Sequence, residues 1–229
     1  MAISMLAPDP VANDAATAPV KRPRVRKALL LWSVLSAVWV MFLAEVLRIF
    51  VGSNFHDVVP GQCYRSAQPT AASLENAQRA YGIRSIVNLR GDNDDCDWYQ
   101  EEVEAARRLN IDLLDAGLHS KQQAPDDEFR TFVQAMKDAK EPILIHCANG
   151  NDRSGFAAAV YLVMRTDTPI SEARKQLGLR YGHFALGKTL SLHRVLDNYE
   201  TWLSGSQLQH NGEHFYYWGM HVYRQEVVE

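Results

Sequence analysis

The sequence predicts an α/β fold, with a mainly parallel central sheet flanked by helices and one transmembrane helix before it. Short apolar runs of strand length alternate with amphipathic runs of helix length between about residues 55 and 203, and Gly, Pro, Asn or Asp separates them. An uncharged stretch at residues 28–44 predicts the membrane helix. The 229 residues suffice for one sizeable core, and a formal net charge of −3 gives no indication of a nucleic-acid partner.

The composition divides the chain into four segments: a disordered basic arm (1–27), a transmembrane anchor (28–51), the α/β domain (54–205) and an aromatic tail (206–229). Residues 28–44 are seventeen positions without a charge, which span about 26 Å as a helix, the lower limit for a bilayer. A cleaved signal peptide is one alternative, but Phe42 is bulky where the cut needs a small residue. A buried core helix, the other alternative, fits poorly after a disordered basic arm.

Charge around the apolar stretch predicts its orientation. Five basic residues lie at positions 21–27, whereas Arg48 and Arg65 are the nearest basic residues after the span. Basic flanks stay in the cytoplasm, so the domain is expected outside the membrane. In a Gram-negative bacterium this means a single-pass protein of the inner membrane with a periplasmic domain.

The elements of the domain follow in chain order. The expected elements are a strand pair turning at Pro60-Gly61, a helix from Thr70 to Tyr81 capped by Thr70 and ended by Gly82, a strand at 83–89, a helix at 98–109, a strand at 111–114, a helix at 128–139 capped by Asp126 or Asp127, a strand at 142–146, a helix at 156–164, a helix at 171–177 and a last helix at 189–203. Because strands and helices alternate, the sheet is expected to be parallel over most of its width.

The stretch from the strand at 142–146 to the following helix carries the chemistry. A turn at residues 147–153 joins them, and such a turn directs backbone N–H groups inward while the helix N-terminus adds positive charge. These donors stabilise the thiolate of Cys147, the form that attacks phosphorus. Arg153 can hold two phosphate oxygens at once, and Ser154 can donate a hydrogen bond to the leaving sulfur. The alternative is a buried structural cysteine at the end of a core strand.

Residues 146–155 resemble the signature of the cysteine-dependent phosphatases, which is His-Cys, five residues, Arg and then Ser or Thr. Residues 64–69, Tyr-Arg-Ser-Ala-Gln-Pro, are similar to a segment of the bacterial and plant dual-specificity-like branch, as is Asn-Leu-Arg at 88–90. The resemblance covers about residues 55–200. It implies a protein tyrosine phosphatase-like fold and hydrolysis through a cysteinyl-phosphate, with no cofactor or metal. The expected phosphate-binding residues are Cys147, Ala148, Asn149, Gly150, Asn151, Asp152 and Arg153.

Four further residues are expected to support the turn. His146 precedes the nucleophile and is expected to hold the loop through backbone groups, with a catalytic base as the alternative. Arg65 and Gln68 are expected to brace the loop or line the pocket, and a structural ion pair is the alternative for Arg65. Arg90 follows a strand at the edge where α/β sheets place ligands, and it either supports the phosphate site or lies in a surface loop.

The general acid has several candidates, because the leaving oxygen needs a proton. Many phosphatases of this class use an Asp about thirty residues before the nucleophile, and Asp115 lies 32 residues before Cys147. The segment expected to align with that loop, residues 119–121, contains no Asp. Some lipid-directed and bacterial members have an Asp directly before the Arg, so the resemblance ranks Asp152 first and Asp115 second. Asp126 and Asp127 come last, because capping explains them.

The substrate stays open between two classes. A phosphorylated protein, as for a tyrosine or dual-specificity phosphatase, is the first expectation. A phospholipid such as phosphatidylglycerophosphate, or the phosphates of lipid A, is the alternative, because a loop of small residues with Asp beside Arg also occurs in lipid-directed enzymes and the anchor would keep the site near head groups. A non-catalytic phosphate-binding module is the third hypothesis, against which the intact Cys147 and Arg153 argue.

Two features lie outside this scheme. The chain has three cysteines, and outside the cytoplasm Cys63 and Cys96 could form a disulfide, or either could trap Cys147. The densely aromatic residues 214–223 are expected to pack on the domain as an edge strand, or else to lie at the membrane interface, where Trp and Tyr are favoured.

Overall fold

The computed structural model describes residues 25–50 and 52–226, and these form two units that divide after Phe42. The first contains most of helix α1 (Val25–Phe50), which has 26 residues. A stretch of 20 residues within it, Ala28–Leu47, is long and apolar enough to cross a membrane, and none of it is buried. A signal sequence near the N-terminus would satisfy the same criteria, so length and composition alone leave both functions open for this helix.

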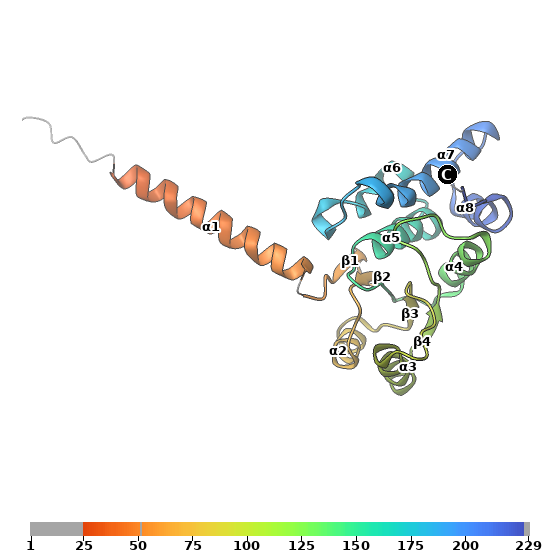
Figure 1. Ribbon diagram of the computed structural model, residues 1–229, viewed down its shortest axis with the longest axis horizontal. Helices are drawn as coiled ribbons and strands as arrows, with labels where there is room; N and C mark the ends of the chain where they lie inside the picture. Colours follow the sequence, from red (N-terminus) through yellow and green to blue (C-terminus); the bar gives the residue numbers. More distant parts are fainter. Residues whose placement is uncertain (1–24, 51, 227–229) are drawn as a thin grey trace, which may run out of the picture. The chain divides into compact units, whose positions relative to one another are not determined.

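The second unit is built on a five-stranded sheet with the order β1-β2-β5-β3-β4 (Figure 1). Its strands are β1 (His56–Val59), β2 (Cys63–Ser66), β3 (Ser85–Asn88), β4 (Asp112–Asp115) and β5 (Ile143–His146). The strands β2, β5, β3 and β4 are parallel, and only the edge strand β1 is antiparallel to its neighbour. The predicted α/β class, with a mainly parallel central sheet flanked by helices, is therefore correct. The parallel strands bring residues 66–68, 88–90 and 146–148 to one edge, where the site lies.

Helices cover both faces of this sheet (Figure 1). On one face α2 (Ala71–Tyr81) and α3 (Asp97–Leu109) bury Leu74 and Ala106 against Ile86 and Leu144 of the central strands. The opposite face is covered by α4 (Asp126–Asp138), α5 (Asp152–Arg165), α6 (Ile170–Ala173), α7 (Leu190–Gly205) and α8 (Gly212–Tyr217). The middle strand β5 is buried at all four of its positions, so the residue that follows it starts from a rigid, enclosed strand.

The ends of α2 form as the sequence predicts. The Thr70 hydroxyl accepts a hydrogen bond from Ser73 N at 3.1 Å, and Ser73 Oγ accepts one from Thr70 N at 2.8 Å. Together they satisfy donors that the first turn of a helix leaves open. Gly82 ends the helix with a positive φ of 68°, a conformation that glycine adopts without strain.

Two predicted features of the helices are wrong in detail. The run at 171–177 is not one helix, since α6 ends at Ala173 and a 3₁₀ turn continues to Gln176. The N-cap of α4 is Pro125 rather than either aspartate; Asp126 and Asp127 lie in the first turn, where carboxylates complement the positive helix end. The helix α7 is the last long helix, as predicted, and only the short α8 and a π-helical segment (Trp218–Val222) follow it.

The aromatic segment packs on the second unit as a helix, so the expectation of an edge strand is wrong. Phe215, Trp218 and Tyr223 are buried in the larger core cluster. The rings of Tyr223 and Phe129 stack with their centroids 3.9 Å apart, and Tyr223 donates a hydrogen bond to Ala124 O at 2.7 Å. These aromatic side chains are enclosed between α4 and α7 and do not lie along the edge of the sheet.

Candidate active site

The turn after β5 forms a small hollow with Cys147 in it. This hollow has a volume of about 60 Å³ and is lined by Ser120, Cys147, Ala148, Asn149, Asn151, Asp152 and Arg153. Cys147 is 3% exposed, and its Sγ lies 3.6 Å from Ser154 Oγ. Because α5 begins at Asp152, the hollow lies at a helix N-terminus, where an anion is favoured.

Gly150 gives the turn its shape. Its φ is 72°, and a Cβ at this position would lie 2.7 Å from Ala67 N and 2.9 Å from the carbonyl carbon of Ser66. Both the backbone conformation and the contact with the chain after β2 therefore require glycine. The turn is thus pressed against the segment that follows β2.

Arg65, on β2, braces the turn from below. It is fully buried, and its Nη2 donates to Gly150 O at 2.9 Å and to Asn151 O at 2.8 Å. Its Nη1 donates to the backbone and side-chain oxygens of Gln176. Burial lowers the pKa of Arg65 to about 10, and the cation still keeps its proton at neutral pH. Arg65 therefore does not face the hollow, but ties it to the segment after α6.

A residue that the sequence did not indicate completes this brace. Asn54 is fully buried, and its Nδ2 lies within hydrogen-bonding distance of Gly150 O at 3.1 Å, Asn151 Oδ1 at 2.8 Å and Tyr181 O at 3.1 Å. His56 Nε2 lies 2.9 Å from its Oδ1. An asparagine just before the first strand shows no pattern in the sequence, because its role depends on contacts with residues about 100 positions away.

Arg153 points back from α5 across the edge of the sheet. Its Nη1 donates to Leu89 O at 3.0 Å and to Leu118 O at 3.3 Å. These carbonyls anchor one side of the guanidinium, while the residue lines the hollow beside Cys147. Ser120, from the loop after β4, closes the hollow on that side and was not among the predicted site residues, although the loop itself was expected to reach the site.

Asp152 lines the same hollow and belongs to a buried polar chain. Its Oδ1 lies 2.7 Å from Nδ1 of His183, whose side chain is fully buried. The Nε2 of His183 in turn lies 3.0 Å from the Nε2 of His193, on α7. Burial, and then the neighbouring His183 and Arg174, lower the pKa of His193. Nothing in the sequence indicates that His183 and His193, which lie 31 and 41 positions after Asp152, converge on it.

The other acid candidates lie elsewhere. Asp115 ends β4, where its carboxylate accepts hydrogen bonds from Tyr99 at 2.6 Å and Asn88 at 2.8 Å. Burial and this contact raise the pKa of Tyr99. Asp126 accepts from Gln225 N at 2.8 Å. Neither aspartate, nor Asp127, lines the hollow around Cys147 in the part of the chain that the structure describes. We therefore retain Asp152 and set the other three aside.

The remaining predicted residues form a network beside the turn. His146 Nε2 lies 2.7 Å from Oε1 of Glu102, and both side chains are fully buried. Gln68 donates to the other oxygen of Glu102 at 3.1 Å and accepts from Arg90 Nη1 at 2.9 Å. Arg90 also stacks on Trp98, 3.4 Å from the ring centroid. Burial, and then the nearby Arg153, lower the pKa of Arg90. This network holds the Arg90 guanidinium between Gln68 and Trp98.

All three cysteines are free thiols. Cys63 lies opposite Ile143, the first residue of β5, whereas Cys147 follows the last. The two cysteines are therefore four residues apart along the strand direction, a separation of about 13 Å, which is beyond the reach of a disulfide. A disulfide between Cys63 and Cys147 is thus excluded in this fold. Burial, and then Glu141, raise the pKa of Cys63 well above its usual value, so this thiol is structural.

A family comparison agrees with this geometry. The model of the tyrosine phosphatase family matches residues 51–165, which is half of the chain. The chain belongs to the tyrosine phosphatase family. The match contains β1 to β5 and α5, so the turn, the brace at Arg65 and the helix start all lie within the family region.

Individual relatives are more distant. The chain is 29% identical over 103 residues to the dual specificity protein phosphatase TpbA of Pseudomonas aeruginosa; the match covers 44% of this chain and 43% of TpbA, less than half of either. Its fold is similar to a DUF442 protein of Shewanella putrefaciens CN-32, with a TM-score of 0.53, 16% identity, and 72% and 96% of the two chains covered. A mutant form of Tk-PTP gives a TM-score of 0.50 at 16% identity, covering 66% and 96%. These two likenesses concern the fold.

Proposed function

We propose that the protein is a membrane-anchored phosphatase that hydrolyses phosphate monoesters through a cysteinyl-phosphate on Cys147. The observation that carries this proposal is the hollow at the start of α5, which is lined by both Cys147 and Arg153 and lies at a helix N-terminus, where an anion is favoured. The family match favours a phosphorylated tyrosine, or a dual-specificity protein substrate.

The proposed reaction has two displacements. The Cys147 thiolate attacks phosphorus in line, an S–P bond forms, and the bond to the leaving oxygen breaks. Arg153 and the backbone N–H groups of residues 148–153 hold the equatorial oxygens, where negative charge is concentrated. Water then attacks phosphorus, the S–P bond breaks, and the returning thiolate accepts a hydrogen bond from Ser154, whose Oγ is 3.6 Å from the sulfur.

Asp152 is the proposed acid and base of these steps. It gives the leaving oxygen its proton, and as a carboxylate it takes a proton from the attacking water. Its Oδ1 is fixed by His183, which leaves Oδ2 for the substrate side of the hollow. His183 and His193 are positioning residues in this scheme, since neither of them lines the hollow.

Phosphate release from an aryl phosphate by the full-length chain in detergent micelles tests the proposal. Cys147→Ser should abolish release, and acid quenching during turnover should trap labelled phosphate on the wild type but not on this variant. Asp152→Asn should lower kcat by about 10²-fold. Release that persists in Cys147→Ser would exclude the cysteinyl-phosphate, and phosphate binding without any turnover in the wild type would favour the non-catalytic module.

The anchor is part of the same proposal. The uncharged apolar run at residues 28–44 of α1 and the basic cluster before it support a single-pass helix in a bacterial inner membrane with a periplasmic domain. The intact mass of the protein from membranes distinguishes anchor from signal peptide, because an anchor retains residues 1–51. A mass that lacks the N-terminal segment would replace the anchor with a cleaved signal.

A phospholipid is the second candidate substrate, favoured by that apolar helix. Comparing phosphate release from phosphotyrosine peptides with release from anionic phospholipid monoesters in vesicles separates the two classes. A peptide preference supports the protein phosphatase. A vesicle preference that disappears when residues 1–51 are deleted supports the lipid phosphatase.

A further inference from the structure

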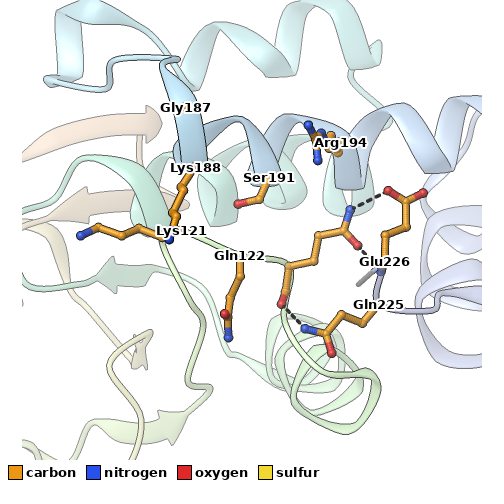
Figure 2. Close-up of a pocket in the computed structure, with 9 residues that line it drawn as sticks. Lys121, Gln122, Gly187, Lys188, Ser191, Arg194, Gln225 and Glu226 are labelled. Carbon is orange, nitrogen blue, oxygen red and sulfur yellow. Dashed lines mark hydrogen bonds between the residues drawn. The ribbon is translucent and has the colours of Figure 1, made fainter. Parts of the chain in front are cut away.

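A second hollow adjoins the one that contains Cys147. It has a volume of about 440 Å³ and lies between the loop after β4, the start of α7 and the C-terminal segment (Figure 2). Its lining residues are Lys121, Gln122, Gln123, Gly187, Lys188, Ser191, Arg194, Gln225 and Glu226. Figure 2 shows Lys188, on the turn before α7, and Ser191 and Arg194, on α7, along one side, with Lys121 and Gln122 on the loop across from them.

The lining carries positive charge that is not neutralised within the described residues. Lys121, Lys188 and Arg194 form no ion pair or side-chain hydrogen bond with any described residue. Glu226 is the only acid of the lining, and its oxygens accept from Asn198 at 3.0 Å and Gln123 at 3.4 Å. The carboxylate is thus directed to amides rather than to the three cations. Cations that share a hollow without a counter-charge repel each other, and a bound anion removes this repulsion.

The wall opposite the cations is fixed. Gln123 accepts at Oε1 from Glu226 N at 2.8 Å, and its carbonyl accepts from Gln225 at 2.9 Å. These bonds fasten the loop after β4 to the C-terminal segment (Figure 2). The hydroxyl of Ser191 has no hydrogen-bond partner among the described residues, so one polar group of the lining is still unsatisfied. A preformed hollow with unpaired cations and a spare hydroxyl matches the chemistry of a phosphate group.

The two hollows share a single stretch of backbone. Ser120 lines the hollow at Cys147 and Lys121 lines the larger one, and consecutive Cα atoms are about 3.8 Å apart. The hollow at Cys147 is so small that it accommodates little beyond the phosphate under attack. The rest of the bound substrate must therefore extend out of this hollow, and the larger hollow lies on the side of Ser120.

We propose that the larger hollow binds a second phosphate of the substrate, so that the preferred substrate is a compact bisphosphate. This inference rests on the proposed phosphatase activity and names the chemistry of its substrate. The scissile phosphate lies against Cys147 and Arg153, and the second lies against Lys188 and Arg194 with Lys121 beside it. A hollow of about 440 Å³ suits a phosphorylated polyol or headgroup better than an extended acidic peptide, which would need a longer groove.

Matched substrates test the proposal on the full-length chain in micelles. The kcat/KM for an inositol bisphosphate, divided by that for an inositol monophosphate, should be about tenfold or more in the wild type. In Lys188→Gln, Arg194→Gln and their double variant this ratio should fall toward one, while the monophosphate rate stays unchanged. Lys140→Gln is the control, because it removes the same charge at the opposite end of the sheet, where Lys140 precedes β5.

The outcomes separate the two proposals. Hydrolysis that depends on Cys147 but shows the same ratio in all variants overturns the second site and leaves the phosphatase intact. If the variants lose as much kcat/KM for an acidic phosphotyrosine peptide as for the bisphosphate, or more, the bisphosphate class is overturned. The same bisphosphate headgroup in vesicles identifies the source: faster turnover there indicates a lipid, and faster turnover in solution indicates a free bisphosphate.

Discussion

His183 Nδ1 lies 2.7 Å from Asp152 Oδ1, and this contact connects the first residue of α5 to a histidine 31 positions later in the chain. When His183 donates from Nδ1 to Oδ1, its Nε2 accepts from His193. Because Oδ1 accepts in this arrangement, the proton that Asp152 exchanges with the substrate lies on Oδ2. The contact with His183 can therefore stay unchanged while Asp152 gains and loses that proton.

The first prediction concerns the hydrogen-bonded side chains of Asp152, His183 and His193. His183→Asn should lower kcat about tenfold with little change in KM, because it removes the partner that fixes Oδ1 of Asp152. The pH profile of kcat should shift in the same variant, and His193→Gln should reproduce the shift more weakly, since Arg174 and Asp197 also act on that ring. A variant with lower stability but an unchanged pH profile would indicate a packing role only.

The second prediction concerns the brace of the turn. Arg65→Met should destabilise the domain by about 3 kcal/mol, because it leaves the carbonyls of Gly150 and Asn151 buried without a donor. Urea unfolding followed by tryptophan fluorescence measures this change. Arg84→Met is the matched control, since Arg84 is an exposed arginine on the same unit and donates to Glu141 O at 3.2 Å. Equal losses in both variants would contradict the bracing role.

The third prediction concerns Gly150. Gly150→Ala should cost about 2 kcal/mol of stability, because its φ of 72° and a contact of 2.7 Å with Ala67 N both exclude a Cβ. Phosphatase activity should fall further than stability explains, because the displaced turn no longer presents its N–H groups. Gly61→Ala is the control: it has a φ of 78° but nothing within 4 Å of a Cβ, so it should reproduce the backbone strain without the activity loss.

The fourth prediction concerns stability and pH. Burial lowers the pKa of His193 and of His210 in the folded state, so the unfolded chain binds more protons than the folded one in mildly acidic solution. Their contribution to stability is fully present above the unfolded value near 6.5 and is lost as the pH falls through the folded values. The free energy of unfolding should therefore decrease from pH 7 to pH 5. A double variant, His193→Gln with His210→Gln, should flatten this slope, and an unchanged slope would contradict the assignment.

The sequence was sufficient for the turn and its surroundings because their information is local. An apolar strand, a short polar turn and a helix opening lie within residues 142–165, and the parallel sheet follows from alternating runs. The same local reasoning failed at Asp115, whose spacing from Cys147 is suitable but whose carboxylate is engaged by Tyr99 and Asn88. Distance along the chain says nothing about which face of a strand end a side chain occupies.

The remaining features depend on contacts between distant positions. Asn54, Glu102 and His183 reach the site from three separate segments of the chain, and none of them belongs to a recognisable motif in the sequence. The helical form of residues 212–222 was missed for a related reason. Its dense aromatic composition is typical of strands, but packing against Phe129 and Tyr199 decides the structure.

The stacking of Tyr223 on Phe129 has a consequence for shortened forms of the protein. Phe215, Trp218 and Tyr223 belong to the same core cluster as β5 and α5. Removing residues 212–226 would therefore uncover the apolar face of α4 and open one side of the larger core cluster. An exposed apolar surface of this kind favours association between copies, so a fragment cut after α7 is expected to aggregate.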